Sequence, residues 1–206
     1  MPWEFLKDLP ALTDTATAEN EALLDSLHAG HAHAATKLAL RCQERGGTPA
    51  QVFEWLLVAA ARGDPAAAEL VALAFFEGSA VTRDPAGARR WLAFAAGRGN
   101  DAAANRLGIA CERGEGGPQD FAEAAAWYAR ATAAGNGHAA LNLARMYAYG
   151  RGVRPSPATA YLLTLIACAA GVEDAAELRD RLAAILPGDT ATRVQARAAA
   201  WRPVAH

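Results

Sequence analysis

The chain has few of the residues that most often carry chemistry or covalent cross-links. Its 206 residues include only three cysteines, and aromatic residues make up 7% of the chain. An odd number of cysteines argues against a disulfide framework, so we expect Cys42, Cys111 and Cys168 to be small core side chains. The sequence also has no glycine-rich phosphate loop after a strand, no nucleophile elbow and no paired carboxylates on an evident scaffold. It therefore predicts neither an enzyme nor a cofactor.

An excess of charge of one sign is missing as well. The formal net charge is −2, so we expect no nucleic-acid partner, because nucleic-acid binding needs a basic surface. No apolar run is long enough to cross a membrane, which argues against membrane insertion. The first ten residues lack the basic start and the apolar core of a signal peptide, so we expect a cytoplasmic protein.

Three histidines near the N-terminus are the obvious candidates for a metal site. They are His28, His31 and His33. His31 and His33 are two residues apart and diverge on a helix, and no nearby cysteine or carboxylate cluster completes a tetrahedron. The sequence therefore predicts no metal site.

What the chain does contain is a pattern that returns every 36 residues. The candidate N-caps are Thr48, Asp84, Asp120 and Ser156, the large side chains are Trp55, Trp91, Trp127 and Leu163, and the closing glycines are Gly63, Gly99, Gly135 and Gly171. Caps, apolar side chains at helical spacing and closing glycines together indicate helices that begin and end in the same register.

Residues 101–135 represent one unit of this pattern. Asp101 is expected to cap a first helix, and Asp120 with Glu123 is expected to form a capping box at the start of a second. Gly108 removes a side chain where the first helix must lie close to the second, and Trp127 is expected to be structural, as a large ring between adjacent hairpins.

One helical hairpin per period predicts an all-α fold, an α-solenoid (right-handed superhelix) of about four 36-residue helix-turn-helix repeats with helical caps. The expected divisions are an N-terminal tail at 1–14, a capping helix at 15–30, repeats at 31–63, 64–99, 100–135 and 136–171, and C-terminal capping helices at 172–206.

The fourth repeat carries a recognisable motif, Leu143-Ala-Arg-Met-Tyr-Ala-Tyr-Gly-Arg-Gly-Val153. With the tryptophan-bearing second helices, this stretch resembles the Sel-like repeat family, a relative of the tetratricopeptide repeats. The resemblance implies a non-enzymatic adaptor or scaffold that binds a peptide or protein, as a monomer or weak oligomer. One alternative is a hydrolase or β-lactam-binding protein, as ascribed to a cysteine-rich branch whose cysteine pairs are missing here. Another is a structural subunit that binds through its ends or convex face.

The resemblance also implies where a partner binds. In the tetratricopeptide-like arrangement, the first helices of the hairpins line a concave groove, which suits a segment with apolar anchors and polar ends. The alternative is an ordinary solvated face whose charges pair among themselves. The implied protein-binding residues are Glu69, Leu73, Phe76, Glu77, Asn105, Ile109, Glu112, Arg113, Leu141, Arg145 and Tyr149.

Overall fold

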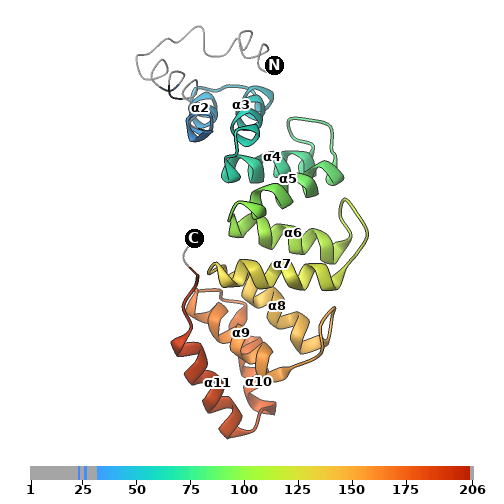
Figure 1. Ribbon diagram of the computed structural model, residues 1–206, viewed down its shortest axis with the longest axis vertical. Helices are drawn as coiled ribbons and strands as arrows, with labels where there is room; N and C mark the ends of the chain where they lie inside the picture. Colours follow the sequence, from blue (N-terminus) through green and yellow to red (C-terminus); the bar gives the residue numbers. More distant parts are fainter. Residues whose placement is uncertain (1–22, 24–25, 27–31, 205–206) are drawn as a thin grey trace. The chain divides into compact units, whose positions relative to one another are not determined.

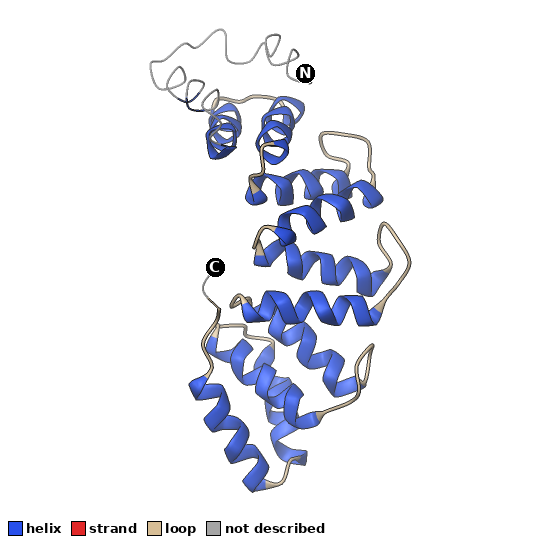
Figure 2. Ribbon diagram, in the orientation of Figure 1, coloured by secondary structure: helices blue, strands red, loops and turns tan. Residues whose placement is uncertain are grey.

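The protein is built from helices of nearly constant length joined by loops. The computed structural model describes residues 23, 26 and 32–204. Over the continuous stretch 32–204 it contains ten helices and no strand (Figure 2), so the all-α prediction is confirmed. The expected tail at 1–14 lies outside the described residues, as do His28 and His31. Of the expected capping helix at 15–30, only residues 23 and 26 are described.

The eight helices from α2 to α9 each contain 13 residues, because the same capping signals recur at the same spacing. The helices are α2 Ala32–Glu44, α3 Pro49–Ala61, α4 Pro65–Glu77, α5 Pro85–Gly97, α6 Asp101–Arg113, α7 Phe121–Ala133, α8 Gly137–Tyr149, α9 Pro157–Ala169, α10 Ala175–Ile185 and α11 Gly188–Ala200 (Figure 1). None of the helices in the described part of the chain has the length and apolar character needed to cross a lipid bilayer.

The second helix of each hairpin begins at its predicted N-cap. The side chains of Thr48, Asp84, Asp120 and Ser156 each accept a hydrogen bond from the backbone amide three residues later. The capping box predicted for Asp120 and Glu123 is wrong in one half. The Asp120 amide donates to the Cys111 carbonyl at 2.9 Å, so Glu123 accepts instead from Nε1 of Trp127 at 3.3 Å.

The N-cap of the first helix of the third hairpin lies one residue earlier than predicted. Asn100, not Asp101, is the N-cap of α6, and its Oδ1 accepts from the Ala103 amide at 2.8 Å. Asp101 is the first helical residue, where the positive end of the helix dipole stabilises a carboxylate. Its Oδ2 also accepts from Nδ2 of Asn136, the N-cap of α8, at 2.9 Å.

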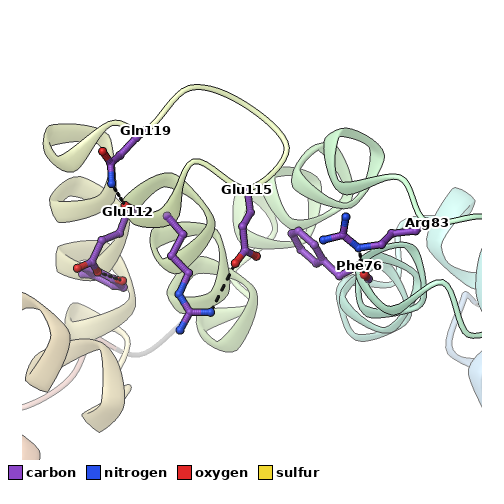
Figure 3. Close-up of polar contacts among 7 residues, drawn as sticks. Phe76, Arg83, Glu112, Glu115 and Gln119 are labelled. Carbon is purple, nitrogen blue, oxygen red and sulfur yellow. Dashed lines mark hydrogen bonds and ion pairs between the residues drawn. The ribbon is translucent and has the colours of Figure 1, made fainter.

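The loops inside the second, third and fourth hairpins begin with the same glycine cap. Gly78, Gly114 and Gly150 end the first helices with φ of 70°, 71° and 69°, which only glycine adopts without strain. A side chain five residues later folds back over the helix end in two hairpins. Gln119 donates to the Glu112 carbonyl at 2.8 Å, and Arg83 donates to the Phe76 carbonyl at 2.9 Å (Figure 3). In these two hairpins the loop side chain therefore satisfies a backbone carbonyl in the last turn of the first helix.

The chain divides into two compact units, residues 1–95 and 96–206, with the division inside α5. In the first unit, α3 packs against α2 and α4, and the rings of Phe53 and Phe75 meet edge to face at 5.6 Å. In the second unit, α7 packs against α6 and α8, and α9 packs against α8, α10 and α11 (Figure 1).

The large ring buried in the third hairpin is that of Tyr128, the neighbour of Trp127, which the sequence predicts to lie between adjacent hairpins. Tyr128 is fully buried and its ring lies against Gly108. Trp127 is only half-buried and lies 5.6 Å from the guanidinium of Arg130. Successive helical residues point in different directions, so only one of the two adjacent rings can face α6. Trp55 is buried as expected, with 3% of its surface exposed, whereas Trp91 is half-buried.

The C-terminal residues continue past the repeats and return to α7. In α11, Val194 is buried and Nε2 of Gln195 donates to the Tyr161 hydroxyl at 3.0 Å. The segment after α11 then lets the Val204 amide donate to the Ala133 carbonyl at 2.7 Å. The end of α7 is therefore covered by the last described residues of the chain.

Candidate interaction cleft

The second unit contains a cleft of about 480 Å³ lined by α6 and α8, with α7 contributing Phe121 and Tyr128. We call it the α6–α8 cleft. Helix α6 supplies Ile109, Glu112 and Arg113, and α8 supplies Asn142, Arg145, Met146 and Tyr149. The loops add Gln119 and Arg151. The α6 residues stand at positions i, i+3 and i+4, and the α8 residues at i, i+3, i+4 and i+7, so each set lies on one face of its helix.

A buried tyrosine and a glutamate form the polar floor of the cleft. The Tyr128 hydroxyl donates to Oε2 of Glu112 at 2.8 Å, and Oε1 of Glu112 lies 3.7 Å from the guanidinium of Arg151. Burial raises the pKa of Tyr128 far above its ordinary value, and the hydrogen bond to Glu112 and the charge of Glu112 raise it further. Tyr128 therefore stays protonated and orients the Glu112 carboxylate.

The rim of the cleft carries three arginines, of which two are paired. Arg151 faces Glu112, and the Arg113 guanidinium lies 3.5 Å from the Glu115 carboxylate. Arg145 is exposed, and its guanidinium has no hydrogen bond or ion pair with any described residue. Exposed ion pairs contribute little to stability. The arginines are therefore available to another molecule at little cost to the fold.

Apolar side chains lie beside these charges. Tyr149, at the end of α8, has 56% of its surface exposed, which makes it one of the exposed large apolar residues of the described chain. Ile109 and Phe121 are half-buried, and Met146 is buried. The cleft thus presents apolar surface and guanidinium groups together, a combination common at the energetic centres of protein interfaces.

Five of the residues proposed from the sequence line this cleft: Ile109, Glu112, Arg113, Arg145 and Tyr149. Two others from the same helices do not. Asn105 is half-buried and its Oδ1 accepts from Nδ2 of Asn142 at 3.1 Å. Leu141 has only 3% of its surface exposed, so its assignment to a binding face is wrong. Burial is favourable for an aliphatic side chain, and the polar Asn142 beside it takes the surface position.

The remaining four proposed residues lie on α4 of the first unit. Glu69, Leu73 and Phe76 are half-buried, and Glu77 is exposed. They do not line the α6–α8 cleft. Their role in binding stays a prediction.

Sequence reasoning missed the residues that reach the cleft from outside the first helices. Gln119 and Arg151 come from loops, whereas the positional rule covers first helices only. Phe121 follows the cap Asp120 at the position where three other repeats have proline, namely Pro49, Pro85 and Pro157. A phenylalanine at a position where the fold accepts proline was a usable signal.

The cysteines and possible metal ligands add no second site to the described chain. Cys42 and Cys111 are buried as expected, but Cys168 is only half-buried, and none of the three forms a disulfide. Burial, followed by the charge of Glu54, raises the pKa of the Cys42 thiol. Among the residues that the structure describes, no three His, Cys, Asp or Glu side chains gather in a way that would hold a metal ion.

Solved structures with the same architecture are known. The protective antigen c5321 of uropathogenic Escherichia coli, which displays an SLR fold, matches with a TM-score of 0.73 and 25% identity over 86% of this chain and 40% of that chain. The Sel1 repeat protein from Oxalobacter formigenes matches with a TM-score of 0.72 and 33% identity over 79% of this chain and 48% of that chain. This chain therefore spans less than half the length of either protein. No curated protein matches it.

A third structure, Helicobacter pylori cysteine rich protein B, matches with a TM-score of 0.53 and 21% identity over 65% of this chain and 98% of that chain, which shows the fold alone. The family model described as Sel1 repeat matches residues 32–64, 65–100, 101–136 and 137–172. These four consecutive matches cover more than half of the sequence. The chain belongs to the Sel1 repeat family, whose members are generally non-enzymatic scaffolds for protein–protein interactions.

Proposed function

We propose that this protein is a non-enzymatic scaffold that binds a peptide or protein segment in the α6–α8 cleft. The observation that carries the proposal is the exposed Tyr149 beside Ile109 and the unpaired Arg145 on the rim of one concavity. Packing within the hairpins does not explain why exposed positions hold these apolar and charged side chains. A partner would contact these side chains.

The size and composition of the cleft support a segment of polypeptide as the occupant. A volume of about 480 Å³ accommodates a few side chains, within the range of about 300–1,000 Å³ that ligand pockets span. Aromatic and arginine side chains dominate the energetic centres of protein interfaces because they combine apolar area with directional hydrogen bonds. A partner that inserts an apolar side chain against Tyr149 would remove that ring from water.

The test is capture of partners from the native cell by the purified protein and by a variant with Ile109→Ala and Tyr149→Ala. Chains that the wild type retains and the double variant loses are cleft ligands, and mass spectrometry identifies them. Ile185→Ala is the matched control, because Ile185 is an apolar side chain of the same unit with 67% of its surface exposed and does not line the cleft. Circular dichroism and melting temperature must match wild type in both variants.

The same comparison tests a second candidate, a structural subunit that binds through its C-terminal helices. The exposure of Ile185 on α10 favours that alternative. If Ile185→Ala loses the partner and the cleft variant retains it, the protein assembles through α10 and not through the cleft. The hydrolase alternative came from the cysteine-rich branch, and the likeness to the Helicobacter pylori protein supports only a shared fold.

A further inference from the structure

The first unit contains the repeat equivalent of the α6–α8 cleft with a different set of side chains. Cys42 corresponds to Cys111 and Thr48 to Asp120 in the repeat register. The first unit has a cleft of about 240 Å³ whose lining includes Gln43, Leu56, Ala74 and Ser79. In that register these residues correspond to Glu112, Tyr128, Met146 and Arg151 of the α6–α8 cleft.

This internal comparison separates what the fold requires from what it does not. The positions equivalent to Arg113, Arg145 and Arg151 hold Glu44, Leu73 and Ser79 in the first unit. Helices α2 and α4 nevertheless have the same 13-residue length as α6 and α8. The fold therefore accepts acidic, apolar or small polar residues at these positions. Arginine at all three positions of the second unit is explained better by recognition than by hairpin packing.

The charge balance of the cleft points to an acidic ligand. Glu112 is held by the Tyr128 hydroxyl and faces Arg151, while Arg113 faces Glu115. Arg145 is left without a carboxylate partner in the described chain, and it shares the cleft lining with Ile109 and Tyr149. A guanidinium presents a planar set of donors that matches a carboxylate with two parallel hydrogen bonds. A single carboxylate would complete the pairing.

We propose that the α6–α8 cleft selects a peptide segment with a carboxylate next to an apolar side chain. The inference rests on the proposed function and specifies the chemistry of its partner. The carboxylate pairs with Arg145, with Arg113 alongside, and the apolar side chain packs between Ile109 and Tyr149. The carboxylate belongs either to an aspartate or glutamate side chain or to the C-terminus of the partner chain, because both present the same two oxygens.

The experiment uses an array of synthetic octapeptides and the full-length protein. In the first half of the array, each peptide has an internal Leu-Glu pair, and the residues on either side of the pair vary. Each of these peptides has a counterpart in which glutamine replaces the glutamate. A second set ends in leucine with either a free or an amidated C-terminus. The strongest binders are then measured by fluorescence polarisation against wild type, Arg145→Gln, Tyr149→Ala and the control Arg154→Gln. Arg154 is also exposed, lies in the α8–α9 loop and does not line the cleft.

We expect the carboxylate form to bind wild type about tenfold more tightly than its neutral counterpart, the size of a charge-assisted hydrogen bond. Arg145→Gln should abolish that preference, Tyr149→Ala should weaken both forms equally, and Arg154→Gln should change neither. The two peptide sets show which source of carboxylate is used. Equal binding of both forms, or a preference that persists in Arg145→Gln, overturns the proposal.

The failure of this inference is distinguishable from the failure of the proposed function. Peptides that lose binding with Tyr149→Ala but show no carboxylate preference leave the cleft as a binding site and overturn only its acidic selectivity. Peptides that bind all variants equally occupy another surface, which overturns the carboxylate proposal and leaves the capture experiment to decide the proposed function. If no array member binds, the carboxylate proposal is overturned, and the capture experiment with native partners decides the scaffold function.

Discussion

Gly108 of α6 lies against the ring of Tyr128 of α7, and a Cβ atom built on Gly108 would come within 2.6 Å of Cε1 of that ring. A real Cβ does not approach a ring carbon so closely, so any side chain at Gly108 must push the two helices apart. Tyr128 in turn hydrogen-bonds Glu112 in the cleft. This contact therefore connects the core of the third hairpin to the α6–α8 cleft.

Substitution of Gly108 tests this contact directly. Gly108→Ala should lower the free energy of unfolding, because overpacking costs about 1–3 kcal/mol and the better helix propensity of alanine returns at most about 1 kcal/mol. Gly97→Ala is the matched control, since nothing lies within 4 Å of a Cβ built at Gly97, at the end of α5. Urea denaturation measures both variants, and equal stabilities would contradict the Gly108–Tyr128 packing.

The sequence predicted the second-helix caps and the closing glycines because these depend on local backbone chemistry that repeats with the period. It did not decide between Trp127 and Tyr128, since two adjacent aromatic residues satisfy the same helical pattern. The deciding fact is the lack of a side chain at Gly108 on the facing helix. Leu141 and Asn142 present the same problem, because the repeat register is accurate only to about one residue on a helix face.

The candidate site was predictable to the extent that it lies on first helices. Ile109, Glu112 and Tyr149 follow from a positional rule applied to each repeat. Phe121 and Arg151 do not follow, because they are brought to the cleft by loops and by packing between hairpins. No periodicity in the sequence reports which loop side chain reaches which helix.

The tryptophans should differ in their contribution to stability. Trp55→Ala empties a site where only 3% of the side chain's surface is exposed, at an expected cost of about 3–5 kcal/mol. Trp127→Ala removes a half-buried ring and its contact with Arg130, at an expected cost of about 1–2 kcal/mol. Chemical denaturation of the two variants gives the order, and a larger loss for Trp127→Ala would contradict the half-buried position of Trp127.

Stability should fall at alkaline pH because of Tyr128. An unfolded tyrosine ionises near pH 10, whereas burial and Glu112 raise the pKa of Tyr128 in the folded protein. Above about pH 10 the unfolded state therefore releases a proton that the folded state retains, which favours unfolding. Tyr128→Phe should remove this part of the pH dependence. Denaturation curves at neutral and alkaline pH measure it, and identical slopes in both proteins would show that Tyr128 is not the group responsible.

The C-terminal helices should be required to keep the fourth hairpin soluble. Deletion of 173–206 removes α10 and α11 from α9 and removes the hydrogen bond from Val204 to Ala133. Buried apolar surface on α9 would then face water, so we expect aggregation or self-association on size-exclusion chromatography. Deletion of 203–206 alone is the control, because it leaves α10 and α11 in place. This shorter deletion should elute from size-exclusion chromatography as wild type does. Equal behaviour of wild type and the longer deletion would show that α9 does not need this cover.

A glycine in the α8–α9 loop should affect both stability and binding. Gly152 has φ of 66°, and its backbone lies so close to the start of α7 that an added Cβ would overlap the Phe121 carbonyl. Gly152→Ala must displace either the loop, which carries Arg151, or Phe121, and both residues line the cleft. We expect a stability loss of about 1–3 kcal/mol and weaker binding of any cleft ligand. Gly188→Ala is the control, because nothing lies within 4 Å of its added Cβ, at the start of α11. Calorimetry with an array peptide measures both effects, and a variant that loses stability but binds normally would show that the loop does not shape the cleft.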